Sequence, residues 1–290
     1  MIKKFDMCLA SLRECYYGRA GLILGSSPSI KSIKRLSFPC IKLALGDLPY
    51  RNKNLGPFDF WVSSNGYYPL PQNLRHLKHI NSLCKNFLLS PACVQLNTSN
   101  ITEVLGTIEN YITDSNVIIY DQRHFDKKAC IPRETCCDFY KHFEVGKCIQ
   151  DLLKLEVGDA KSYGVSHTVA AHGFAIAVLL KLNPIFIAGV NLPTVWKEYR
   201  TYRPFKFPMG FKTLRFNIYK VRNPKKTTPF SGYAFAEILD DFSYIASVAR
   251  RLGIHIYSLE KDSPINNVRG IDKISVMDAN LLMHNYGQNV

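Results

Sequence analysis

Short apolar runs alternate along the chain with longer segments in which apolar residues recur every three or four positions. Such runs are typical of β-strands when turn residues bound them, whereas the longer spacing is typical of helices. Strands are predicted at 21–24, 40–45, 58–63, 85–89, 116–120, 184–190 and 254–259. Helical segments are predicted at 30–36, 70–80, 100–112, 144–155, 166–182 and 233–252.

This alternation of strands and helices predicts an α/β fold, with a doubly wound, mostly parallel sheet of the Rossmann-like kind. The run 184–190, PIFIAGV, is apolar throughout, as expected of a parallel strand that is covered on both faces. No internal repeat divides the chain, so residues 1–290 are predicted to form a single α/β domain. Segment 191–232 is too long for a simple connection and is predicted to be a lid or active-site insertion within that domain.

Composition narrows the class of protein. Hydrophobic residues make up 47% of the chain and charged residues 21%, which argues against disorder. The nine cysteines include no C-x-x-C pair, which favours free thiols in a reducing cytoplasm. The most apolar run, 169–180, is too short to span a bilayer, and Asp6 and Arg13 interrupt any signal-peptide pattern. We therefore expect a cytoplasmic protein, with peripheral contact to the inner face of a membrane left open.

The formal net charge is +14, and segment 191–232 carries ten Lys or Arg against one acid, Glu198. Nine aromatic residues are interleaved with these cations, including Tyr199 between Lys197 and Arg200. The concentration of positive charge predicts an anionic partner that binds at one place, with Arg200 and Arg203 as candidate anion-binding residues. A solvated basic face and single-stranded nucleic-acid binding are the alternatives, and nucleic acid is the less favoured because the frame is enzyme-like. Docking on an anionic membrane is a further use that is compatible with an enzyme.

The first predicted strand ends in a tight turn, Gly25-Ser26-Ser27-Pro28-Ser29. Glycine lets backbone approach a ligand closely, and small serine side chains leave a pocket open. A helix that begins near Pro28 directs N–H groups and the positive end of its dipole at an anion. The turn is therefore predicted to bind a nucleotide or phosphate; the alternative is an ordinary βα turn without a ligand.

The string LILGSSPSIKSI around this turn resembles the opening of the bacterial lipooligosaccharide sialyltransferases. In that family the first strand ends in a Gly-x-x-Pro-Ser-Leu-Lys turn at the donor nucleotide. The same turn opens the related hydroxymethylpterin pyrophosphokinase-like proteins of archaea and domains of flagellin-modifying glycosyltransferases. The resemblance implies that Gly25, Ser26, Ser27, Pro28 and Ser29 bind the donor.

Three further patches resemble the sialyltransferases in the same order along the chain. FDFWVSSN is similar to a strand that ends in a donor-contacting Asn, which places Asn65 in that role. HTVAAHGFAIAVLLKLNPIFIAGVNL resembles a turn, helix and strand that place Thr168 and Asn191 at the donor. ARRLGIHIYSLEKDSPIN resembles the family's last helix and strand, ending in Ser263.

The resemblance implies a glycosyltransferase that moves a sugar from a nucleotide-activated, CMP-linked donor to a glycan or lipid-linked acceptor. Sialic acid or another nonulosonic acid is the implied sugar, and no metal or other cofactor is required. The oligomeric state is not implied. In the family two tyrosines hold the leaving phosphate; Pro193 and Tyr199 occupy those positions here.

The chain departs from the family at the catalytic base. The family's His precedes the final helix, but no His lies between His172 and His255. An inverting transfer needs a general base, and Glu237, Asp241 and His167 are the replacement candidates, with Asp240 beside them. The alternative for the acids is structural, because carboxylates in the first turns of a helix interact favourably with the helix dipole. The alternative for His167, and for His172 near it, is a core or capping residue. Asp121, at a strand end, is a further candidate for the site or for a turn.

Two alternative functions remain open. An ATP-dependent pyrophosphokinase-like transferase needs Mg²⁺ and a pair of carboxylates, but the matching positions hold Asn65 and Asn191. A non-catalytic nucleotide- or nucleic-acid-binding protein of the same fold would explain the missing His.

Overall fold

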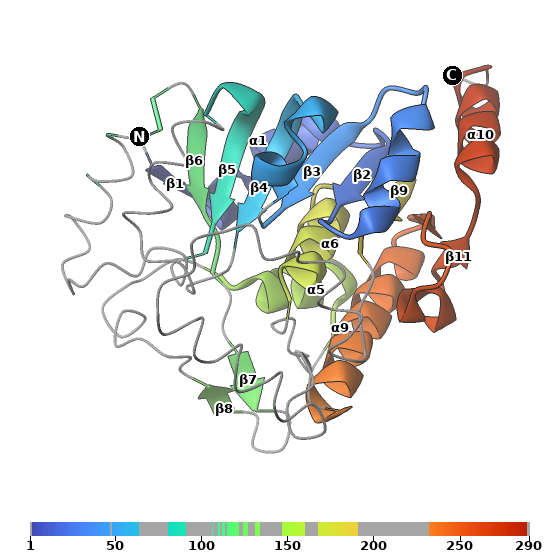
Figure 1. Cartoon of the computed structure of the whole chain (residues 1–290). Coiled ribbons are helices and arrows are strands. Elements are labelled where there is room, and N and C mark those ends of the chain that lie inside the picture. Colours follow the sequence, from blue (N-terminus) through green and yellow to red (C-terminus); the bar gives the residue numbers. More distant parts are fainter. Residues whose placement is uncertain are drawn as a thin grey trace, which may run out of the picture.

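The computed structural model describes residues 2–46, 48–63, 81–90, 106, 110, 112–113, 115–121, 124–126, 131–133, 147–159, 168–190 and 232–288. Nine strands form one sheet in the order β1-β6-β5-β4-β3-β2-β9-β10-β11 (Figure 1). Its strands are β1 (Ile2–Lys4), β2 (Gly21–Leu24), β3 (Ile41–Leu45), β4 (Phe58–Ser63), β5 (Cys84–Leu89), β6 (Asn116–Ile119), β9 (Ile185–Ala188), β10 (Ile256–Ser258) and β11 (Asp272–Lys273). A separate antiparallel pair joins β7 (His124–Asp126) to β8 (Ile131–Arg133).

All eight pairings within the large sheet are parallel. Strands β2 and β9 are buried along their whole length, which is why their sequences are apolar without alternation. The sheet confirms the predicted α/β class. Each of the seven predicted strands is present, with its ends shifted by at most a few residues.

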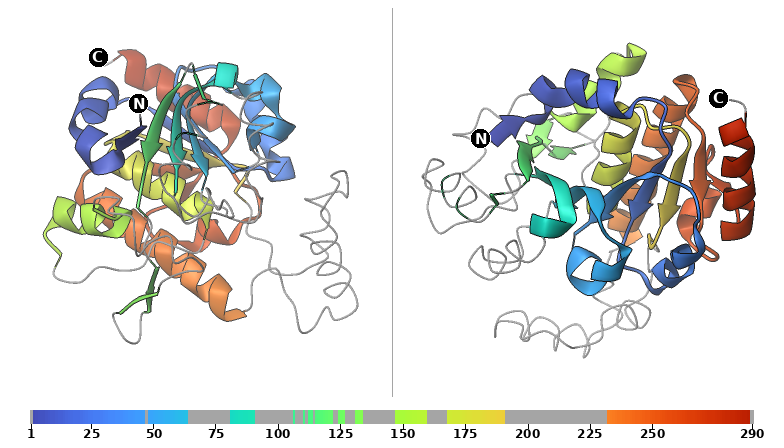
Figure 2. Two further views of the ribbon diagram at one scale, coloured as in Figure 1. Left: turned by 90° about the vertical axis from the view of Figure 1, so that its left-hand side faces the viewer. Right: turned by 90° about the horizontal axis from the view of Figure 1, so that it is seen from above.

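Helices cover both faces of the sheet (Figure 2). One face carries α1 (Phe5–Tyr16), α5 (Ile149–Val157), α6 (Val169–Leu179) and α9 (Gly232–Arg251). The other carries η1 (Pro28–Arg35), α2 (Leu48–Arg51), η2 (Lys53–Leu55) and α10 (Val276–Gln288). Two short 3-10 turns, η3 (Asn81–Leu83) and η6 (Pro264–Asn267), complete the described helices.

Helix α6 is the centre of the first layer. Ten of its eleven residues are buried, and it contacts β2, β3 and β4 below it and α5 and α9 beside it. Phe174 of α6 packs on Phe242 of α9, with ring centroids 5.7 Å apart. Burying each such aromatic side chain contributes about 1.5–3 kcal/mol, so this layer holds the sheet in one arrangement.

The predicted helices agree in part. Segments 166–182 and 233–252 correspond to α6 and α9, and 144–155 overlaps α5, which begins at Ile149. Segment 30–36 lies in η1, a 3-10 helix that begins earlier, at Pro28. The structure does not describe segment 70–80 or most of 100–112. Of the predicted lid at 191–232, only Gly232 belongs to the described residues.

The order of strands places a topological switch point between β2 and β9. From β2 the chain proceeds outward through β3, β4 and β5 to β6, whereas β9, β10 and β11 follow on the opposite side. In open parallel sheets the connections on the two sides of such a point diverge, and ligands bind outside the carboxyl ends of the strands there. The carboxyl ends of β2 and β9 are therefore where a site is expected.

Candidate functional site

The two strand ends at the switch point are joined by a pair of glycines. A Cβ atom on Gly25 would lie 2.2 Å from the carbonyl oxygen of Gly189, and one on Gly189 would lie 2.3 Å from that of Gly25. The N–H of Gly25 donates to Ala188 O (2.8 Å), and that of Ser27 donates to Gly189 O (3.0 Å). Gly189 has a φ of +69°, in the left-handed region that favours glycine. Glycine at position 25 thus permits a close approach of two backbones, a reason different from the ligand approach that the sequence suggested.

Glu260, two residues after the end of β10, connects three segments of this edge. It is 2% exposed, and its Oε1 accepts hydrogen bonds from Ser29 Oγ (3.0 Å) and from the N–H of Val190 (3.1 Å). Burial raises the pKa of this carboxyl, and the hydrogen bonds from Ser29, Val190 and Gly189 oppose part of that rise. A buried carboxylate therefore lies directly behind the predicted donor turn.

Sequence reasoning missed Glu260. The signal was present, because Glu260 follows the apolar run IHIYSL, just as Asp121 follows NVIIY at another strand end. Polar residues at the carboxyl ends of parallel strands are candidates for a site.

The serine side chains of the turn form a chain of hydrogen bonds. Ser27 Oγ lies 2.8 Å from Ser29 Oγ, and Ser29 Oγ donates onward to Glu260. Ser27 is buried, whereas Ser26 and Ser29 are partly exposed. The N-terminus of η1 has Pro28 in its first turn, and no side chain caps it.

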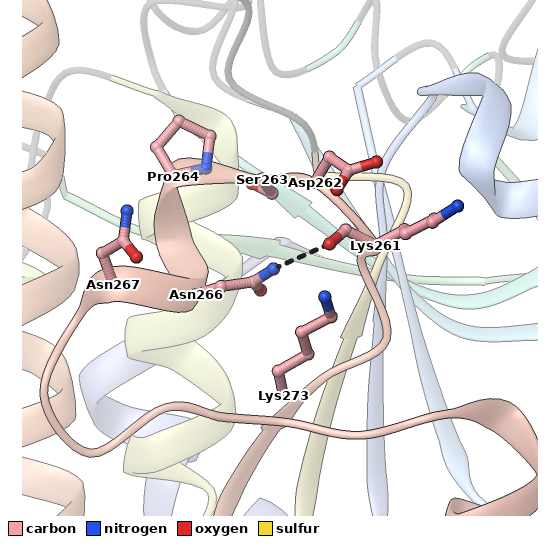
Figure 3. Close-up of a pocket in the computed structure, with 7 residues that line it drawn as sticks. All are labelled: Lys261, Asp262, Ser263, Pro264, Asn266, Asn267 and Lys273. Carbon is pink, nitrogen blue, oxygen red and sulfur yellow. Dashed lines mark hydrogen bonds between the residues drawn. The ribbon is translucent and has the colours of Figure 1, made fainter.

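A pocket of about 520 Å³ opens beside this edge, where the chain leaves β10 (Figure 3). It is lined by Lys261, Asp262, Ser263, Pro264, Asn266, Asn267 and Lys273. Asn266 Nδ2 donates to the carbonyls of Glu260 (3.0 Å) and Lys261 (3.4 Å), and Ser263 Oγ donates to Val190 O (3.1 Å). The pocket therefore shares its wall with the Glu260 network and adds two cations, Lys261 and Lys273, and one acid, Asp262.

A second polar group lies where β4, β6 and α6 meet. His172 of α6 is 1% exposed, and its Nδ1 lies 3.3 Å from the hydroxyl of Tyr120. That hydroxyl donates to the carbonyl of Ser63 (3.3 Å). Asp121, 1% exposed, forms a β-bridge with Cys148, and its carbonyl accepts from the N–H of Ile149. His172 is thus a buried residue that contacts Tyr120 at the carboxyl end of β6. The carbonyl of Asp121 accepts the N–H of the first residue of α5.

Thr168 is the N-cap of α6, and its Oγ1 accepts a hydrogen bond from the N–H of Ala171 (3.1 Å). Its predicted contact with the donor stays a prediction. Among the base candidates, Asp241 is 1% exposed in α9 and Asp240 is exposed on the same helix. Glu237 also lies in α9, but its side chain is outside the described part of the structure. Asn65, His167, Asn191, Tyr199, Arg200 and Arg203 lie outside the described residues.

Within the described ranges, no group of three or more His, Cys, Asp or Glu side chains is placed to hold a metal ion. In the same part of the chain, no helix combines the length and apolar character needed to cross a membrane.

No family model and no curated protein matches the chain. Among solved structures, the fold is similar to an α-2,3-sialyltransferase from Campylobacter jejuni in its apo form, at 14% identity and a TM-score of 0.42, over 88% of this chain and 80% of that one. It is also similar to the sialyltransferase CstII of the same organism in complex with cytidine-5'-monophosphate (14%, TM-score 0.45, 88% and 85%). A third is that enzyme with a trisaccharide acceptor and CMP (14%, 0.41, 87% and 86%). Identities and TM-scores this low assign no function.

Proposed function

We propose that the protein is a glycosyltransferase that uses a nucleotide-activated sugar, with a CMP-linked nonulosonic acid such as sialic acid as the donor. The observation that carries the proposal is the position of the Gly25–Ser29 turn. It lies at the switch point of a parallel sheet, where α/β proteins bind their ligands. It also has the sequence that resembles the donor turn of the lipooligosaccharide sialyltransferases.

The proposed reaction is an inverting sugar transfer to a glycan or lipid-linked acceptor. A base accepts the proton of the acceptor hydroxyl, and the acceptor oxygen attacks the anomeric carbon. The bond from that carbon to the phosphate oxygen breaks, and the nucleotide leaves with the electron pair. Glu237, Asp241 and His167 are the proposed bases; Asp241 already lies buried on the helix that packs against α6.

Cations are proposed to stabilise the charge on the leaving nucleotide, since preorganised positive groups at a developing phosphate charge replace a metal ion. Arg200 and Arg203 of the proposed lid, with Tyr199, are assigned this role. Lys261 and Lys273 of the pocket beside the Glu260 network add positive charge at the described edge. The same basic surface would hold the protein against an anionic membrane that presents a lipid-linked acceptor.

Ligand-dependent thermal stability tests the donor class. We expect CMP to raise the melting temperature without Mg²⁺, and to raise it more than UDP, GDP or ATP do. A ligand at 100 times its Kd stabilises the folded state by about 2.7 kcal/mol, so the shift should be measurable. Stabilisation by ATP only in the presence of Mg²⁺ would instead support the pyrophosphokinase-like function. A response to oligonucleotides alone, lost at high salt, would support the nucleic-acid-binding alternative.

Turnover is tested by the release of CMP from CMP-sialic acid in the presence of glycan acceptors. The substitutions Glu237→Gln, Asp241→Asn and His167→Asn each remove one proposed base. We expect one of them to lower kcat by about 100-fold or more while CMP still binds. Asn65→Ala is expected to weaken CMP binding, and unchanged binding would show that the pocket lies elsewhere.

A further inference from the structure

The side chain of Tyr120 connects the ends of three strands to helix α6. Tyr120 follows β6, and its N–H donates to the carbonyl of Leu89 in β5 (3.1 Å). Its hydroxyl reaches past β5 to β4, where it donates to the carbonyl of Ser63 (3.3 Å). The same hydroxyl lies 3.3 Å from Nδ1 of His172 in α6, and the two rings meet edge to face with centroids 5.7 Å apart. One residue therefore contacts β4, β5 and α6 at the carboxyl edge of the sheet.

The elements that Tyr120 connects are those from which two predicted donor residues extend. Ser63 is the last residue of β4, and Asn65 follows it by two positions along the chain. His172 lies one helical turn after Thr168, and its N–H donates to the carbonyl of Thr168 (3.2 Å). Asn65 and Thr168 are both predicted to contact the donor. The two segments must keep a fixed separation if both residues are to contact one nucleotide.

The carbonyl of Ser63 is the point at which Tyr120 acts on β4. This carbonyl accepts hydrogen bonds from the N–H of Ser90 (3.0 Å) and from the hydroxyl of Tyr120. Two such bonds fix the orientation of the peptide group that begins the segment after β4. Tyr120 and His172 are 0% and 1% exposed, and a buried polar group that loses its partner is costly. The two side chains therefore affect a ligand through the backbone that they hold.

From these contacts, and resting on the proposed function, we propose that Tyr120 and His172 are positioning residues of the donor site. They hold the end of β4 and the first turns of α6 at the separation that lets Asn65 and Thr168 contact the same nucleotide. Neither residue exchanges a proton with the substrates, so their effect falls on donor affinity. Loss of the link raises KM for the donor and leaves kcat unchanged, as expected when binding is weakened equally in the ground and transition states.

Three substitutions probe the link, and a fourth is the control. Tyr120→Phe removes the hydroxyl and keeps the ring in the core. His172→Leu removes the polar ring, whereas His172→Asn keeps a polar group near the position of Nδ1 that can donate or accept. Phe174→Leu is the matched control, because Phe174 lies on the same helix, is fully buried and packs on Phe242 of α9. Thermal unfolding confirms that each variant is folded and measures its loss of stability.

Titration calorimetry with CMP and kinetics with CMP-sialic acid measure the effect on the donor. We expect Tyr120→Phe and His172→Leu each to weaken CMP binding by about fivefold, the effect of one hydrogen bond. The double variant should also lose about fivefold rather than about 25-fold, because both substitutions break the same link. His172→Asn should bind CMP more tightly than His172→Leu. Phe174→Leu should lower the melting temperature and leave CMP affinity unchanged.

The outcomes distinguish this inference from the function on which it rests. If folded Tyr120→Phe binds CMP as tightly as wild type, or if the two losses multiply in the double variant, the inference is wrong while the proposed function stands. An equal loss of affinity in Phe174→Leu would overturn it too, because CMP binding would then follow stability alone. His172→Asn that binds CMP no better than His172→Leu removes His172 from the link. If the wild-type protein binds none of CMP, UDP, GDP and ATP, the proposed function fails, and the inference fails with it.

Discussion

The contact between Gly25 and Gly189 makes position 25 the most sensitive test of the site's backbone. In Gly25→Ala the new Cβ would lie 2.2 Å from the carbonyl oxygen of Gly189 and 2.8 Å from its carbonyl carbon. Carbon and oxygen approach to about 3.3 Å at closest in ordinary contacts, so one strand end must move by about 1 Å. No flexible side chain is available to give way, because the closest atoms belong to the backbone.

The magnitude follows from what such a shift disrupts. Overpacking a buried position costs about 1–3 kcal/mol. The shift also weakens the hydrogen bonds from Gly25 to Ala188 and from Ser27 to Gly189, at about 1 kcal/mol each. We therefore expect Gly25→Ala to lower the free energy of unfolding by about 3 kcal/mol. At about 2 °C per kcal/mol for a chain of this size, the melting temperature should fall by roughly 6 °C.

Urea and thermal unfolding of Gly25→Ala and Gly158→Ala provide the assay and its control. Gly158 has a left-handed φ of +68°, but a Cβ there would meet nothing within 4 Å. Its substitution therefore reports only the backbone preference of glycine, about 1 kcal/mol. A loss in Gly25→Ala no greater than that in Gly158→Ala would refute the close approach of β2 and β9.

Three further predictions concern the scaffold. Thr168→Ala should lower the free energy of unfolding by about 1 kcal/mol in urea titrations, because α6 loses its N-cap bond; a loss of CMP affinity in addition would support the donor contact. Burial raises the pKa of Glu156, but bonds from Lys181 and Arg13 outweigh it and leave the pKa lowered. The ionised Glu156 therefore stabilises the folded state above the ordinary glutamate pKa of about 4.3, and this stabilisation is lost as pH falls through the lowered pKa. The melting temperatures of wild type and Glu156→Gln should differ at pH 7 and converge toward pH 3. Burial raises the pKa of Cys84 to about 12, whereas Cys15 is exposed, so iodoacetamide at pH 8 should modify Cys15 well before Cys84, as peptide mass spectrometry would show.

The strands could be predicted from sequence because a parallel sheet covered on both faces requires continuous apolar runs, as in PIFIAGV. The outer elements could not. Strand β11 has two exposed residues, which leave no pattern. Helix α10 exposes Met277 and Leu281, so its apolar residues do not mark one buried face. The 3-10 form of η1 could not be predicted either, because Pro28 and the serines indicate where a helix begins but not the spacing of its hydrogen bonds.

The turn could be located from sequence, but the buried carboxylate behind it could not. Gly25-Ser26-Ser27-Pro28-Ser29 is a local pattern, and local patterns predict turns and helix starts. Ser29 and Val190 both donate to Glu260, which is 231 residues from Ser29 and 70 from Val190 in the chain. Three adjacent strand ends of a doubly wound sheet bring these residues together, and only their order in space shows that the acceptor of Ser29 is a buried carboxylate. A turn that the sequence predicts can therefore be bonded to a buried residue far along the chain, because the order of strands that brings the two together is not a local property of the sequence.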